Sequence, residues 1–147
     1  MTSSDHSRHD GPRAAATFTG ADHPAMEAYR DAVEAVVGFS HRQAALEAVL
    51  DRCAHFAVGH AYAAFIAGLL GQDRRARDLA VSANATSRST SRRERQLVEI
   101  LVVSSAGQRQ RAAGLAAEHI LEYPADRCTL AAIVQWVDAR NAPSAAG

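Results

Sequence analysis

Gly71–Ala80 reads GQDRRARDLA and Gly107–Ala116 reads GQRQRAAGLA, so the pattern Gly-Gln-x-x-Arg-Ala-x-x-Leu-Ala occurs twice, 36 residues apart. A repeat of this length is typical of arrays of helical hairpins. Glycine can end one helix in a left-handed turn, and alanines in the next helix allow close approach to a neighbour. The repeated phrase therefore predicts two consecutive helical hairpins with the same packing.

Apolar side chains recur at helical spacing on both sides of the two phrases. They predict three helical hairpins followed by a terminal seventh helix. Ser91 and Glu94 have the spacing of a capping box and mark the start of the fifth helix. Asn84–Thr90 is expected to be the connector before it. The first five expected helices cover about residues 24–38, 40–53, 57–70, 73–83 and 92–106. The sixth carries the apolar stripe from Ala112 to Leu121 and stops at Tyr123, before Pro124. The seventh follows from Asp126 as its cap and runs to about residue 140.

The composition fits one all-α domain. Hydrophobic residues make up 48% of the 147 residues and aromatic ones only 5%, which predicts a core of small aliphatic side chains. The formal net charge is zero, so a global attraction to nucleic acid or membranes is not expected. A cytoplasmic protein is expected, because the start lacks an apolar stretch and the two cysteines are isolated. The expected organisation is a disordered leader (1–23), a helical repeat domain (24–140) and a flexible tail (141–147).

The spacing of small residues resembles the tetratricopeptide repeat, which has small residues at positions 8, 20 and 27, glycine near 15 and proline at 32. The matching residues, expected to pack the repeats together, are Ala64, Gly71, Ala76 and Ala83, then Gly107, Ala112 and Pro124. The later repeat departs from the pattern at Ile100 and His119. The resemblance implies an α-solenoid that binds proteins.

A narrower resemblance is to the N-terminal part of the tetratricopeptide repeat protein 38 family. It covers about residues 25 to 138. The stretches that carry it are Phe56–Ala61, Ser91–Gln96 and Glu122–Asp126. This family implies neither a reaction nor a cofactor.

Two apolar surfaces are the candidate interaction sites. In tetratricopeptide arrays the first helix of each hairpin lines a concave groove, and the groove candidates here are Ala61, Phe65, Leu97 and Leu101. The terminal helix supplies Ile133, Trp136 and Val137, which could dock a partner or a second copy of the chain because interfaces are enriched in Trp. The sequence thus favours a non-enzymatic scaffold or adaptor that binds a protein or peptide.

Two alternatives stay open. Arg88, Arg92, Arg93 and Arg95 could form a basic rim for a nucleic-acid accessory role, which we rank below protein binding. An enzyme or small-ligand domain could use a groove near His60 and His119. Cys53, His55 and His60 are too few for a zinc site, and no catalytic set or phosphate loop is apparent, so no metal or cofactor is expected.

Overall fold

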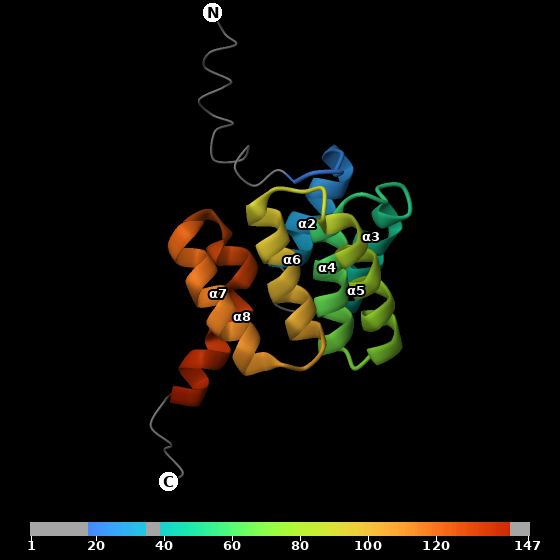
Figure 1. Cartoon of the computed structure of the whole chain (residues 1–147). Helices are drawn as coiled ribbons and strands as arrows, with labels where there is room; N and C mark the ends of the chain where they lie inside the picture. Colours follow the sequence, from blue (N-terminus) through green and yellow to red (C-terminus); the bar gives the residue numbers. More distant parts are fainter. Residues whose placement is uncertain (1–17, 35–38, 142–147) are drawn as a thin grey trace, which may run out of the picture.

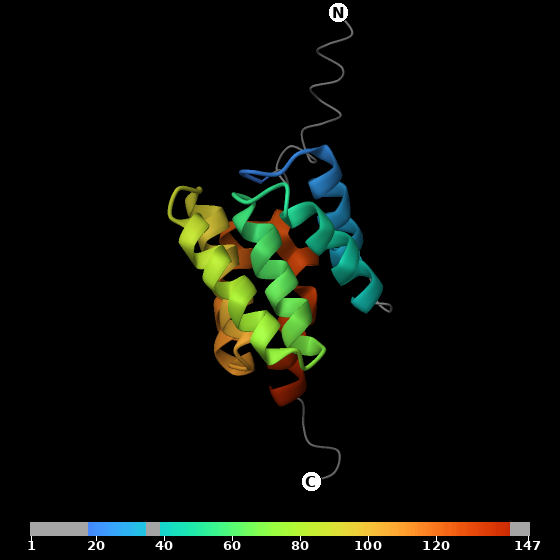
Figure 2. The same ribbon diagram turned by 90° about the vertical axis from the view of Figure 1, so that its right-hand side faces the viewer.

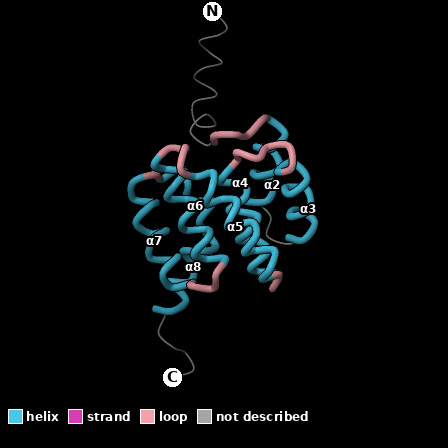
Figure 3. Tube along the Cα trace, turned by 45° about the vertical axis from the view of Figure 1, so that its right-hand side comes forward, coloured by secondary structure: helices cyan, strands magenta, loops and turns pink. Residues whose placement is uncertain are grey.

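All secondary structure in the computed structural model is helical over the residues it describes, 18–34 and 39–141 (Figures 1 and 3). Side chains are described for 18–34 and 42–135. The helices are α2 (His23–Glu34), α3 (Phe39–Leu50), α4 (Ala57–Leu69), α5 (Asp73–Ser87), α6 (Arg92–Ser105), α7 (Arg109–Glu122), the 3₁₀ helix η1 (Pro124–Asp126) and α8 (Arg127–Asn141). The prediction of an all-α chain is confirmed for these residues. In this described part, every helix is too short or too polar to cross a lipid bilayer.

The two repeated phrases begin in the same turn. Gly71 and Gly107 have φ angles of 76° and 85°, the left-handed region that glycine enters without steric cost. In each turn the glycine amide donates to the carbonyl three residues earlier, and the following glutamine amide donates to the carbonyl five residues earlier. This is the Schellman arrangement, which satisfies the last carbonyls of α4 and α6.

Helix α6 begins at the predicted capping box. The Ser91 hydroxyl accepts a hydrogen bond from the Glu94 amide at 3.2 Å, and the Glu94 carboxylate accepts one from the Ser91 amide at 3.4 Å. The connector before it is shorter than Asn84–Thr90, because α5 continues to Ser87. Thr86 and Ser87 donate side-chain hydrogen bonds to carbonyls of the preceding turn, so these polar residues extend the helix instead of ending it.

Consecutive helices pack against one another, and α4 lies at the centre between α5 and α6 (Figure 1). Every residue from Ala57 to Ala67 is buried. Figure 2 shows α2 and α3 (blue to teal) forming one edge of the molecule, with α8 (red) behind α4 (green). An aromatic cluster joins α2 to α4 through edge and stacked ring contacts of Phe18, Tyr29, Phe56, Tyr62 and Phe65.

The first and last described helices meet. The Tyr29 hydroxyl on α2 lies 3.1 Å from the Thr129 hydroxyl on α8, and both side chains are buried. The segment before α2 also belongs to the packed structure, since Phe18 is in the core and Thr19 is bonded to Glu94. Packed structure therefore includes Phe18 and Thr19, which lie ahead of the boundary expected at residue 23. The rest of the expected leader (1–17) and of the tail (142–147), and the expected end of the first helix at Gly38, lie outside the described residues.

Candidate interaction site

The four residues expected to line a concave groove are in the core. Ala61, Phe65, Leu97 and Leu101 are each at most 1% exposed. They lie on α4 and α6, which pack against each other and, in the case of α4, against α5 and α2. Because these side chains are enclosed by neighbouring helices, they do not form an open surface for a partner.

The residues expected to pack the repeats together lie in helix contacts and in turns. Ala64, Ala76, Ala83 and Ala112 are almost completely buried between helices. Gly71 and Gly107 form the turns described above, and Pro124 opens η1. In the terminal helix, Ile133 is fully buried. The side chains of Trp136 and Val137 lie outside the described residues, so self-association through them remains a prediction.

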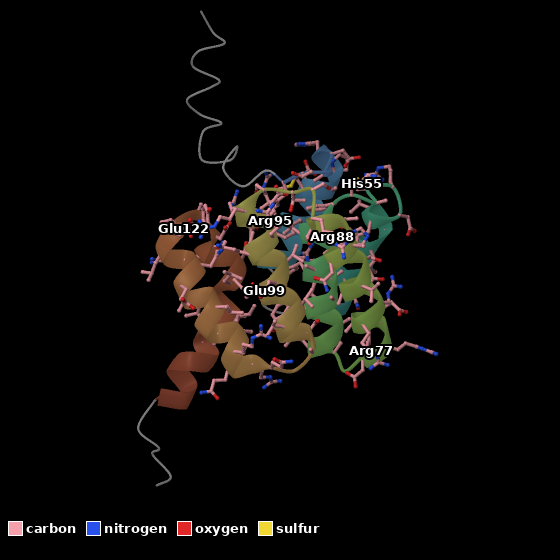
Figure 4. All side chains as sticks on the ribbon, in the orientation of Figure 1. His55, Arg77, Arg88, Arg95, Glu99 and Glu122 are labelled. Carbon is pink, nitrogen blue, oxygen red and sulfur yellow. The ribbon has the colours of Figure 1, made fainter. Side chains whose placement is uncertain are left out.

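Three of the four arginines expected to form a basic rim are engaged within the chain. Arg92 pairs with Glu122, Arg93 pairs with Asp126, and Arg95 donates to the Thr90 carbonyl. Figure 4 shows Arg88 and Arg95 at the same end of the molecule, with Glu122 also at that end. The acidic partners neutralise Arg92 and Arg93, which reduces the local positive charge that phosphates would meet.

A buried polar network lies at the junction of α6, α7 and η1. His119 Nδ1 is 2.7 Å from Gln96 Oε1, and His119 Nε2 is 2.8 Å from Asp126 Oδ2. Arg93 donates from Nε to Asp126 Oδ2 at 2.8 Å and from a second nitrogen to the other carboxylate oxygen. Burial by itself raises the pKa of Asp126, but the hydrogen bonds from Arg93 and His119 outweigh it and hold that pKa below its ordinary value.

His60 and His119 lie in different parts of the fold. His60 Nδ1 is 2.9 Å from the Phe56 carbonyl, and the ring borders a cavity of about 170 Å³ between α3, α4 and α5. His119 belongs to the α6–α7 hairpin, so the two histidines do not form the joint ligand or catalytic groove that the sequence suggested.

Over the described part of the chain, His, Cys, Asp and Glu side chains nowhere gather in a group that could hold a metal ion. Cys53 is buried and Cys128 exposed, both as free thiols.

A groove between α6 and α7 lies next to the buried network and shares His119 and Gln96 with it. Its volume is about 410 Å³. Ile100 and His119 form a buried floor. Leu121 stands at its edge with 86% of its surface exposed. We call this site the α6–α7 groove; its other lining residues are Arg92, Gln96, Glu99, Leu115, Glu118 and Glu122. Figure 4 shows Glu99 and Glu122 on this hairpin.

Sequence reasoning did not select this groove. Leu121 fits the apolar pattern of α7 together with Ile120, yet two adjacent residues of a helix point about 100° apart. Ile120 is partly buried against the core, which leaves Leu121 in solvent. The adjacent pair Ile120 and Leu121 was the feature of the sequence that could have indicated an exposed leucine.

The chain matches no family model, no curated protein and no solved structure.

Proposed function

We propose that this chain is a tetratricopeptide-like scaffold that binds another protein and catalyses no reaction. The repeated phrase supports the tetratricopeptide-like part, because both copies start with a left-handed glycine turn and continue with a buried alanine. Arrays of this kind present rigid surfaces built from stacked hairpins. The binding surface we propose is the α6–α7 groove.

The observation that carries the proposal is Leu121 at the edge of this groove. A single exposed leucine is ordinary on a protein surface. This one lies beside a concave site of about 410 Å³ that also includes the partly buried Leu115. Concave sites with an apolar contact and a few polar groups are favoured places for recognition.

Hydrogen bonds within the chain fix the floor of the groove in the absence of a partner. His119, which forms part of the floor, has both ring nitrogens within hydrogen-bond distance of buried or partly buried oxygens of Gln96 and Asp126. A side chain fixed in this way loses little conformational freedom on binding. The network therefore supports recognition by a preformed site.

The test is quantitative affinity capture from an extract of cells that express the protein. Leu121→Ala should reduce recovery of the specific partner at least about fivefold, because it removes apolar area that binding would bury. The matched control is Val81→Ala on α5, where a 68% exposed apolar residue lies outside the groove. Equal recovery with all three proteins, or loss with Val81→Ala only, would refute the proposed surface.

A further inference from the structure

We infer that the α6–α7 groove binds a basic segment of the partner, with an apolar side chain against Leu121 and Lys or Arg side chains against Glu99 and Glu118. This inference rests on the proposed function and specifies the chemistry of the partner. It depends on three features: the charges of the groove, its difference from the preceding hairpin, and its lining, to which α6 and α7 alone contribute among the described residues.

The lining of the groove is acidic. It contains three carboxylates, Glu99, Glu118 and Glu122, and the single guanidinium of Arg92. Arg92 pairs with Glu122, so the other two carboxylates carry the excess charge. The side-chain carboxylate of Glu118 makes no ion pair or hydrogen bond with any described residue. Glu99 approaches Arg111 only to 3.9 Å, and both side chains are more than half exposed, so this pair is weak.

The preceding hairpin shows that the fold does not require these residues. It contains the same phrase 36 residues earlier and forms the same turn. Yet smaller, uncharged side chains stand at the corresponding positions: Ala63 for Glu99, Ser82 for Glu118, Ala85 for Leu121 and Thr86 for Glu122. A helical hairpin with this packing therefore forms without the carboxylates or the exposed leucine, which leaves them available for recognition.

The corresponding space of the preceding hairpin is partly filled by another helix. There, His60, Leu79 and Ser82 correspond to Gln96, Leu115 and Glu118. Glu47 and Leu50 of α3, with Asp51 directly after it, also line that smaller cavity, and Glu47 is bonded to Arg75 of α5. Among the described residues, only α6 and α7 line the α6–α7 groove. A segment from outside the chain can thus lie where α3 lies in the earlier unit.

The complementary occupant is cationic and partly apolar. Carboxylates at both sides of the groove attract Lys and Arg side chains and repel phosphates or acidic peptides. Leu121 and Leu115 provide apolar contact between these charges. A short amphipathic basic segment satisfies both conditions.

The probe for the test is a fluorescein-labelled peptide of about twelve residues that repeats the sequence Arg-Leu-Leu-Arg. As a helix this peptide is about 18 Å long. The probe of opposite charge is a peptide of the same length that repeats Glu-Leu-Leu-Glu. Fluorescence anisotropy should detect binding of the basic peptide and not of the acidic one. The affinity should fall as salt is raised, because exposed charges are screened. The double variant Glu99→Gln with Glu118→Gln, and separately Leu121→Ala, should each weaken binding about tenfold.

The control for net charge is Glu27→Gln with Glu34→Gln on α2, where both residues are exposed. It should change the affinity by less than about twofold, since these sites lie outside the groove. Absence of binding, or equal weakening by the two double variants, would overturn the inference. If capture depends on Leu121 while the charge variants have no effect, the proposed function holds and the basic partner is wrong. If nothing depends on Leu121, the proposed function itself fails.

Discussion

Replacing Asp126 with alanine is expected to reduce the free energy of unfolding by about 3 to 5 kcal/mol, because it leaves the buried His119 and the half-buried Arg93 without their shared acceptor. A loss of this size is a large part of the stability of an ordinary domain. Chemical denaturation followed by circular dichroism measures it. The control is Glu122→Ala, which removes only the exposed pair with Arg92 and should cost less than about 1 kcal/mol.

The effect of Asp126 also has a defined pH dependence. The folded-state pKa of this carboxyl is below its ordinary value, so its stabilising contribution is fully present above the unfolded pKa of about 3.9. The contribution is lost as the pH falls from there through the folded pKa. The difference in unfolding free energy between the wild type and Asp126→Ala should therefore decrease as the pH falls below about 4. A difference that grows over this acidic range would contradict the expected effect.

Replacing Glu94 with alanine is the second change with a large expected effect, about 2 to 3 kcal/mol. The buried carboxylate accepts from the Thr19 amide at 2.7 Å and from the Thr19 hydroxyl at 2.8 Å, and it also completes the capping box with Ser91. One substitution thus removes the carboxylate half of the capping box of α6 and the attachment of the segment before α2. Thermal denaturation measures the total loss.

Amide hydrogen exchange separates these two roles of Glu94. In Glu94→Ala the Thr19 amide should exchange much faster, because it loses its acceptor. Glu118→Ala is the control, since that exposed carboxylate has no partner among the described residues, and it should change stability by less than about 0.5 kcal/mol. Unchanged protection of Thr19 in Glu94→Ala would show that the attachment does not depend on the carboxylate.

Local signals in the sequence predicted the helices well. The glycines at 71 and 107 end helices because the turn needs a positive φ, and Ser91 with Glu94 starts α6 through contacts three residues apart. These determinants act within one turn of chain. The end of α5 was misplaced because Thr86 and Ser87 can bond either to their own helix or outside it, and the composition alone does not decide.

Contacts between distant residues were not predictable in the same way. Thr19 and Glu94 are 75 residues apart, and Tyr29 and Thr129 are 100 residues apart. The burial of Phe65 and Leu97 follows from how α2, α3, α5 and α6 pack around α4. A helical pattern could place these residues on one face without showing what covers it. Asp126 had the spacing of a helix cap, and its role as the acceptor for Arg93 and His119 depends on three elements meeting.

The most direct test of the central claim, that the α6–α7 groove binds a partner protein, is position-resolved photocrosslinking. A benzophenone side chain is placed at Leu121 in one protein and at Val81 in another, both of which are well exposed. We expect a discrete crosslinked partner from position 121 that decreases when the basic peptide is added, and none from position 81. Crosslinking of the same partner from position 81 only, or no crosslink from position 121, would contradict it.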